Sequence, residues 1–346
     1  MYYQPPYRIT TKIVHLLTDI AERLGEIKSI NSEMNTPQLR KKNQIKTITG
    51  TLQIEGNTFS EEKVTAVLEG KRVLGTPKEI AEVKGAIAVY EKLGQYDCHN
   101  IKHLLYAHQV LMGQILTHAG QFRTKAVGVH GKKGVTHIAP QANRLSGLMT
   151  DLFNWLKHTE EHPLISSSVF HYEFEFIHPF IDGNGRMGRL WQTLILSKWK
   201  PLFQTVPVES TIRDYQQDYY HALKQSGVDG ESTAFIEFML VIILKSIQRP
   251  DQVTDHVADQ VIDYVPDQAN EQITDQIIGQ VTIQVKNLLV VIGNNWKSSK
   301  ELMHKLNLSH KPTFRKNYLN PALEQKLIIM KYPDSPRSPK QRYKKT

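Results

Sequence analysis

The residues best suited to chemistry lie in one short stretch of the chain, which runs from His178 to Arg189 as His-Pro-Phe-Ile-Asp-Gly-Asn-Gly-Arg-Met-Gly-Arg. Gly183 and Gly185 permit backbone conformations that other residues avoid, and the apolar residues that follow predict a helix over 185–198. A Gly-Asn-Gly turn at the start of a helix presents backbone N–H groups and the positive end of the helix dipole. The pattern therefore predicts a phosphate site.

The charged side chains around this turn fit the same interpretation. Arg186 and Arg189 are three residues apart, so both are expected on one helix face within reach of phosphate oxygens. Asp182 places a carboxylate beside the turn, where a ligand to Mg²⁺ is commonly found. His178 at the rim is suited to accept a proton from an attacking hydroxyl, because imidazole titrates near neutral pH. This set indicates nucleotidyl or phosphoryl transfer by positioning and charge neutralisation, without a covalent enzyme intermediate.

The stretch matches every specified position of the signature HPFx(D/E)GNGRxxR, so the chain strongly resembles the Fic (filamentation induced by cAMP) family. The resemblance implies a protein adenylyltransferase, a nucleotidyltransferase that carries AMP from ATP onto a Ser, Thr or Tyr hydroxyl of a target protein. Under that resemblance His178 deprotonates the hydroxyl and Asp182 holds Mg²⁺. The remaining nucleotide-binding residues implied by the family are Gly183, Asn184, Gly185, Arg186 and Arg189, of which the last binds the γ-phosphate.

A second match lies upstream, where Thr51-Leu52-Gln53-Ile54-Glu55-Gly56 resembles the (S/T)xxxE(G/N) inhibitory helix of the family. Thr51 and Glu55 are four residues apart and therefore share a helix face. The resemblance implies that Glu55 pairs with Arg189, removes the partner of the γ-phosphate and leaves ATP in an unproductive pose. The enzyme is thus expected to be autoinhibited. Because this glutamate supports removal of AMP in some relatives, de-AMPylation stays open as an alternative activity.

Two further regions resemble the family. Glycines and β-branched residues between Phe122 and Ile138 predict a hairpin, which corresponds to the family's flap and implies that a target segment docks there by strand addition. Tyr219 and Tyr220 resemble a tyrosine pair near the family's adenine pocket, although aromatic core packing explains either residue equally well.

The elements that must position these residues are mainly helical. In the first helix, apolar side chains recur at three- and four-residue spacing, which is typical of an amphipathic helix. Further helices are expected from Pro37 to Ile54 with Gly56 as the C-terminal cap, and at 61–68, 78–93, 99–117, 143–158, 163–177, 185–198, 210–226 and 231–248. The fold class expected for this part is a mainly α Fic core with a β-hairpin flap, preceded by an N-terminal helical domain.

The C-terminal third has a different pattern. Apolar residues recur at every fourth position over 251–285, where seven acidic residues occur without Lys or Arg. A period of four drifts around a helix but keeps one face of a strand, so the conformation stays open and a linker or partner-docking segment is expected. Residues 286–346 predict three helices and a basic hairpin, which is the winged-helix (α+β) pattern. Thirteen Lys or Arg against three acids over 297–346 favour contact with nucleic acid or describe a solvated tail.

The expected domains are an N-terminal helical domain over 1–95 with the inhibitory helix, a catalytic core over 96–248, a linker over 249–285 and a winged helix over 286–346. The single cysteine, Cys98, excludes a disulfide framework and a cysteine-rich zinc site, and is typical of a cytoplasmic protein. The N-terminus has no signal-peptide pattern, and the apolar runs are far shorter than a bilayer requires, so no membrane contact is expected.

Three functional hypotheses follow. The first is AMP transfer to a protein hydroxyl. The second keeps the enzyme class but changes the transferred group to UMP, phosphate or phosphocholine. The third is a transcriptional regulator that acts through the winged helix, in which Arg315, Lys316 and the basic tail would contact DNA phosphates. The winged helix could instead contact a protein or pair two copies of the chain into a homodimer.

Overall fold

The computed structural model describes residues 3–30, 37–131, 134–248, 283–292, 296–306, 314–325, 327–332, 338 and 341–345. The chain divides into two compact units, Met1–Ile262 and Asp263–Thr346, and each is described here by itself. Most of the four-residue repeat, 251–282, lies outside the described residues. The expected division into four domains stays a prediction.

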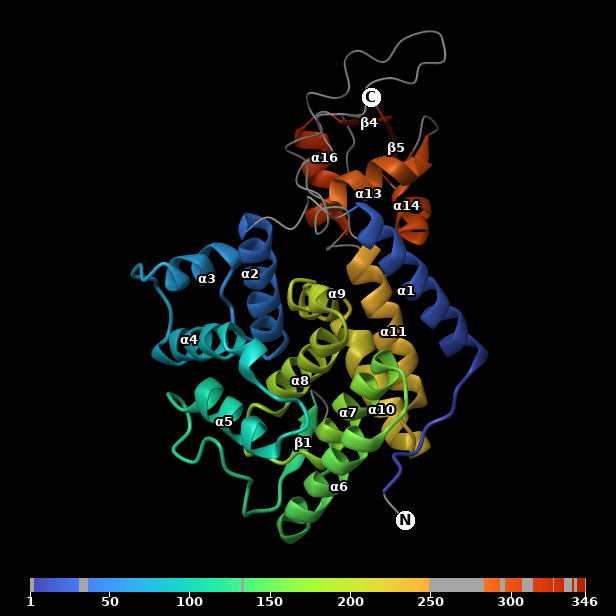
Figure 1. The fold of residues 1–346 in the computed structure, drawn as a ribbon. Helices are drawn as coiled ribbons and strands as arrows, with labels where there is room; N and C mark the ends of the chain where they lie inside the picture. Colours follow the sequence, from blue (N-terminus) through green and yellow to red (C-terminus); the bar gives the residue numbers. More distant parts are fainter. Residues whose placement is uncertain are drawn as a thin grey trace. The chain divides into compact units, whose positions relative to one another are not determined.

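The first unit is helical apart from one hairpin (Figure 1). Its helices are α1 (Thr11–Ile30), α2 (Pro37–Ile54), α3 (Glu61–Leu68), α4 (Pro77–Glu91), α5 (Ile101–Met112), α6 (Leu145–His158), α7 (Pro163–Ile177), α8 (Asn184–Trp199), α9 (Val208–Asp214), α10 (Gln216–Asp229) and α11 (Thr233–Gln248). The predicted mainly α fold class is confirmed. Two helix starts have side-chain caps of the kind that these residue types favour: Ser60 accepts a hydrogen bond from Lys63 N, and Thr76 forms a capping box with Glu79.

The core of this unit forms around α7 and α8, which pack against each other. α8 is buried along most of its length, and Trp191, Leu190 and Leu194 are fully inaccessible. α2 packs on α9, and α1 packs on α11. In Figure 1, α8 lies in the middle of the unit. Because α8 is enclosed in this way, its N-terminus is held in a fixed position.

The flap consists of β1 (Gly128–Gly131) and β2 (Gly134–Ile138), which pair antiparallel with a register irregularity between Val129 and His130. The expected hairpin is therefore present, but its strands begin only at Gly128, because Phe122 to Val127 form an irregular segment between α5 and β1.

The second unit contains α13 (Ile283–Ile292), α14 (Ser299–Lys305), α16 (Asn320–Glu324) and a sheet of the order β3-β5-β4. The strands are β3 (Lys297–Ser298), β4 (Ile328–Met330) and β5 (Arg342–Lys345), and both pairs are antiparallel. Val285, Leu288, Phe314 and Tyr343 belong to a separate apolar cluster. This unit therefore adds a small three-stranded sheet to a mainly α chain.

Two expected helices differ from the structure. The helix expected over 210–226 is divided into α9 and α10 at Tyr215, whose backbone (φ −112°, ψ 32°) leaves the helical region while its ring lies 3.9 Å from Lys245 Nζ. The third helix expected within 286–346 includes a π-helical turn, Arg315–Leu319, before α16. Apolar periodicity does not distinguish a continuous helix from one with such a break. None of the described helices combines the length and the hydropathy needed to cross a bilayer.

Candidate active site

The loop between α7 and α8 has a backbone that its sequence dictates. α7 ends at His178, whose φ of 51° and ψ of 60° are left-handed, and His178 is the one described non-glycine residue with positive φ. Pro179 favours this ending, because the residue before a proline avoids the right-handed helical region. Asn184 then closes the loop: its amide accepts from Phe180 N and donates to Phe180 O, both at 2.9 Å. A left-handed histidine costs about 1–3 kcal/mol, which surrounding contacts must offset.

The imidazole of His178 lies at the rim of the site with 19% of its side chain exposed. Its Nδ1 lies 3.4 Å from the carbonyl oxygen of Glu175, a contact that favours the proton on Nδ1. Nε2 then carries the lone pair of the neutral ring, and it is the atom that a general base needs. His178 therefore lies at the junction of α7 and the loop, with a partly exposed side chain.

The N-terminus of α8 forms the opposite end of the site. Gly183 has a φ of 87° and precedes the helix without a side-chain cap, so the first N–H groups of α8 are available to an anion. Asp182 Oδ1 accepts from Gly183 N at 2.6 Å and from Arg186 Nη2 at 3.0 Å. Its side chain is 42% exposed, and within the described residues Oδ2 accepts no hydrogen bond. That oxygen fits the single protein ligand that Mg²⁺ commonly takes.

Arg186 and Arg189 are held by different partners. Arg186 is buried between Asp182 and Glu82, whose Oε1 lies 3.6 Å from Nη1. Its Nε and Nη1 are buried and make no hydrogen bond to the described part of the chain. The structure thus turns the Arg186 side chain toward Asp182 and Glu82, while Arg189 turns toward α2.

Arg189 is buried and bonded to the predicted inhibitory motif. Its Nη2 donates to Glu55 Oε1 at 2.6 Å and to the Thr51 carbonyl at 3.2 Å, and its Nε donates to Thr51 Oγ1 at 3.0 Å. Burial alone would lower the pKa of Arg189, but the charge and hydrogen bond of Glu55, together with Tyr219 and Glu175, outweigh burial and raise the pKa. Gly56 follows with a φ of 90° and ends α2 as the sequence predicts. The ion pair expected between Glu55 and Arg189 is therefore present.

Gly185 has a different role from the one its sequence suggests. It lies inside α8 with ordinary helical φ, so no special backbone conformation requires glycine there. A Cβ at this position would collide with Glu55 Oε1 and would lie 3.1 Å from Arg189 Nη1. The absent side chain therefore lets a carboxylate and a guanidinium sit directly on the first turn of the helix. The glycine serves close approach, which its sequence position alone does not reveal.

The C-terminal end of α2 is anchored to α9 and α10. The Ile54 carbonyl accepts from Gln216 Nε2 at 2.8 Å and from the Tyr220 hydroxyl at 3.2 Å. Tyr219 is fully buried and its hydroxyl lies 3.1 Å from His171 Nε2. The structure therefore separates the two tyrosines: Tyr219 belongs to the core, and Tyr220 reaches the end of the inhibitory helix.

Three residues near the loop escaped the sequence analysis: His108, Arg123 and Glu175. His108 accepts from Gly120 N through Nδ1 at 2.8 Å and lies 3.0 Å from the Asp182 carbonyl through Nε2. Burial lowers the pKa of His108 to about 4, which keeps it neutral. Its ring stacks on Phe180 at a centroid distance of 3.6 Å, so His108 supports the loop through Phe180.

Glu175 lies between the two ends of the site. Its carboxylate is 4.0 Å from His178 Nδ1 and 3.9 Å from His171 Nε2. Burial raises the pKa of Glu175 to about 7, although Arg189 opposes the shift. A sequence signal existed, since a glutamate three residues before His178 shares its helix face, but no local pattern marks such a residue as buried.

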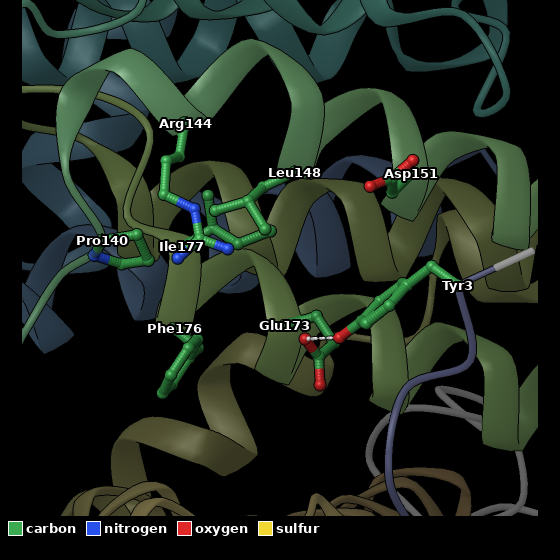
Figure 2. A pocket seen from close by; sticks show the side chains of 8 residues that line it. All are labelled: Tyr3, Pro140, Arg144, Leu148, Asp151, Glu173, Phe176 and Ile177. Atoms are coloured by element: carbon green, nitrogen blue, oxygen red, sulfur yellow. Dashed lines mark hydrogen bonds between the residues drawn. The ribbon is translucent and has the colours of Figure 1, made fainter.

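A pocket of about 140 Å³ lies beside the loop, between α6, α7 and the N-terminal segment. Figure 2 shows the Tyr3 hydroxyl bonded to the Glu173 carboxylate, at 2.8 Å, on one side of this pocket. Burial raises the pKa of Glu173. The other lining residues are Pro140, Arg144, Leu148, Asp151, Phe176 and Ile177. The pocket therefore borders both the residue before His178 and the segment that follows β2.

Comparisons with known proteins match two parts of the chain to family models. Residues 98–196 match the model of the Fic/DOC family, and residues 283–346 match that of the "Filamentation induced by cAMP protein Fic-like, C-terminal domain". A Fic family protein from Desulfovibrio desulfuricans G20, of known crystal structure, is similar over 99% of this chain and 98% of its own, with 47% identity and a TM-score of 0.70.

More distant relatives are similar over part of the chain. A protein named "Protein adenylyltransferase Fic" from Culex quinquefasciatus is 27% identical over 67% of this chain and 47% of its own length. A protein of the same name from Drosophila mojavensis is 27% identical over 64% of this chain and 44% of its own. The chain thus spans about half the length of these curated relatives. Fic-1 from C. elegans (residues 134–508) shares the fold, with a TM-score of 0.57 and 23% identity over 68% of this chain and 71% of its own.

Proposed function

We propose that this chain, which belongs to the Fic family, is a protein adenylyltransferase that moves AMP from ATP to a Ser, Thr or Tyr hydroxyl of a target protein. One observation carries the proposal. A carboxylate of the chain itself, Glu55, lies on the uncapped first turn of α8 and pairs with Arg189 at 2.6 Å. Such a turn attracts an anion, so an internal carboxylate there marks the place that a nucleotide phosphate would take.

The phosphates of ATP would bind across the start of α8. The backbone N–H groups of Gly183, Asn184 and Gly185 would face them, Arg189 would hold the γ-phosphate, and Arg186 would add positive charge. Asp182 would hold Mg²⁺ through its exposed carboxylate oxygen. When bound, the metal supplies positive charge that neutralises the phosphates. Tyr220 borders the end of α2 and would lie beside the nucleotide. Tyr219 would instead support the nucleotide site from the core, through its contact with His171.

The reaction would take place at the other end of the site. Nε2 of His178 would take the proton of the target hydroxyl as its oxygen forms a bond to the α-phosphorus. The bond from that phosphorus to the bridging oxygen of the β-phosphate would break, and pyrophosphate would leave with its electron pair. The target would lie along the flap, where β1 or β2 offers main-chain groups for strand addition.

Glu55 would restrain this reaction in the resting protein. While its carboxylate holds Nη2 of Arg189, the guanidinium lacks a free fork for the γ-phosphate, and the carboxylate itself repels the phosphate. The contacts of Thr51, Gln216 and Tyr220 fix the end of α2 in this position. Activation would then require the Glu55 side chain to move, which its 30% exposure permits.

The second unit favours a secondary hypothesis of a winged helix that contacts DNA or a protein, or pairs two copies of the chain. Its helices are followed by the antiparallel pair β4 and β5, and β5 carries Arg342, Lys344 and Lys345. Arg342 already pairs with Glu301 at 3.4 Å, and Lys344 lies over Trp296 at 5.4 Å. Retention of the full chain on a DNA column at low salt, lost as salt rises, would support DNA contact; no retention would exclude it.

The test of the proposed function uses ATP labelled either at the α- or at the γ-phosphate. The purified Glu55→Gly variant, with Mg²⁺, should label itself from α-labelled ATP only, since the γ-phosphate leaves in pyrophosphate. The Glu55→Gly/His178→Ala double variant is the matched control and should label nothing. Label from γ-labelled ATP would instead indicate phosphate transfer, and label that is independent of His178 would contradict the proposal. A donor other than ATP and removal of AMP are alternatives within the same family, and label from UTP in place of ATP would favour the former.

A further inference from the structure

Arg123 makes an unusual set of contacts in the irregular segment before the flap. Within the described residues, its guanidinium is bonded to main-chain carbonyls only: Nε to His178 O at 2.8 Å, Nη1 to Lys125 O at 2.9 Å, and Nη2 to Pro140 O at 2.6 Å and Ile177 O at 3.4 Å. Its own backbone N–H donates to Pro179 O at 2.9 Å. Arg123 thus reaches the catalytic loop through both its side chain and its main chain.

These carbonyls belong to three separate segments of the chain. Lys125 precedes β1 and Pro140 follows β2, so they mark the two ends of the flap. Ile177 and His178 form the junction between α7 and the catalytic loop. One side chain therefore joins the surface on which a target would dock to the residue that would accept its proton.

The electrostatics of Arg123 indicate that position, rather than charge pairing, is its role. The residue is 2% exposed, and no ion pair of Arg123 occurs within the described residues. Burial lowers the pKa of its guanidinium. A buried cation without a counter-charge is costly, and here four carbonyl contacts replace the carboxylate. Only the planar fork of arginine, with five donors in fixed directions, can make such a set, because lysine is a single point donor.

We propose that Arg123 is a positioning residue that fixes the His178 loop and both ends of the flap in one register, so that a strand added to the flap brings its hydroxyl to His178. The left-handed backbone of His178 needs such support, because this conformation is strained for a residue other than glycine. The inference rests on the proposed function for the meaning of this register. The contacts themselves stand independently of it.

Arg123 makes no hydrogen bond to the described groups that would bind ATP. Asp182, Arg186 and Arg189 have other partners, and the first turn of α8 has no side-chain cap. A positioning role therefore predicts a division of effects that general loss of structure would not produce. Transfer should slow while the affinity for ATP stays the same.

The test compares Arg123→Met and Arg123→Lys in the Glu55→Gly background, with Arg23→Met as the matched control. Arg23 is a half-buried arginine of α1 whose Nε also lies near a carbonyl, that of Ile247, at 3.4 Å. With α-labelled ATP at saturation, self-labelling by Arg123→Met should slow about a hundredfold, as expected for a misplaced base. Arg123→Lys should recover part of the rate and stay roughly tenfold slow. The affinity for ATP, measured by calorimetry, should change less than about twofold.

Hydrogen exchange tests the same inference without activity. In Arg123→Met, amides in the peptides 121–127 and 178–183 should exchange faster, while those of α8 and α11 should keep their wild-type rates; Arg23→Met should change neither loop peptide. Unchanged exchange at the loop in Arg123→Met, or an unchanged labelling rate, would overturn the inference. If the Glu55→Gly parent transfers no AMP, the proposed function fails, and the exchange result still decides whether Arg123 holds the loop and flap together.

Discussion

At the phosphate end of the candidate site, carboxylate side chains hold the arginines. At the hydroxyl end, the loop of His178 is held through its own main-chain carbonyls. Arg189 pairs with Glu55, and Arg186 pairs with Asp182. His178 is fixed through its own backbone and the guanidinium of Arg123. A carboxylate can be exchanged for a phosphate of the same charge sign, but a main-chain frame cannot be exchanged. The phosphate end is therefore suited to regulation, whereas the hydroxyl end keeps a fixed geometry.

The largest effect on AMP transfer is expected at the hydroxyl end. His178→Ala should lower AMP transfer by about 10²–10⁴-fold, the usual contribution of a general base, because no other described side chain replaces Nε2 at the loop. ATP affinity, measured by calorimetry in the Glu55→Gly background, should stay the same. A variant that still transfers AMP at the parent rate would remove His178 from the mechanism and end the contrast between the two ends.

A smaller effect of opposite sign is expected at the regulated end. Glu55→Gly should raise self-labelling with ATP about 10–100-fold, because a charged hydrogen bond of about 1.5–3 kcal/mol no longer holds Arg189. Glu69→Gly is the matched control: this glutamate also ends a helix and pairs with cations, Lys41 and Lys71, but lies elsewhere. Equal labelling by wild type and Glu55→Gly would show that the pair does not restrain the enzyme.

Glu175 joins the two ends and predicts a pH dependence of stability. Its pKa of about 7 in the folded protein lies above the ordinary value of 4.5, so the folded state binds more protons between these limits than the unfolded state. The contribution of Glu175 to stability should therefore fall as pH rises from about 4.5 through 7, by on the order of 3 kcal/mol, whereas the lowered pKa of buried His108 contributes with the opposite sign. Glu175→Gln should remove this contribution, so that its free energy of unfolding, measured with denaturant at a series of pH values, should decline less with pH than that of the wild type. Glu91→Gln, on the exposed end of α4, should keep the contribution, and a wild-type slope in Glu175→Gln would refute the assignment.

The smallest effect is expected for the hydroxyl that assists Glu55. Thr51→Val keeps the side-chain shape but leaves Nε of the buried Arg189 without its 3.0 Å partner, which should cost about 1–2 kcal/mol in the free energy of unfolding. Thr51→Ser should restore the wild-type value, because it returns the oxygen. If Thr51→Val unfolds at the wild-type midpoint, the hydroxyl contributes nothing to holding Arg189.

The sequence predicts the local parts of the fold well. The cap at Ser60, the end of α7 at His178, the left-handed glycines Gly56 and Gly183, and most helices could be predicted, because each depends on nearby residues. The break at Tyr215 and the π-helical turn could not be predicted, because apolar spacing does not distinguish them from a continuous helix.

The same distinction holds within the site. Residues inside the family motif could be predicted by type and spacing, and the resemblance to the family implied the pairing of Glu55 with Arg189. Arg123, His108 and Glu175 could not be predicted, because their importance comes from partners far along the chain: Arg123 is bonded to the carbonyl of His178, 55 residues away. Gly185 was misjudged because the atom that needs its space, Glu55 Oε1, belongs to another helix.

The central claim is that the site transfers AMP and that Glu55 restrains it. The most direct measurement is the intact mass of the purified chain after incubation with ATP and Mg²⁺, for wild type, Glu55→Gly and Glu55→Gly/His178→Ala. The account predicts that Glu55→Gly gains the mass of one or more AMP groups, wild type gains little, and the double variant gains none. A gain of phosphate mass, or the same AMP gain in wild type and Glu55→Gly, would contradict it.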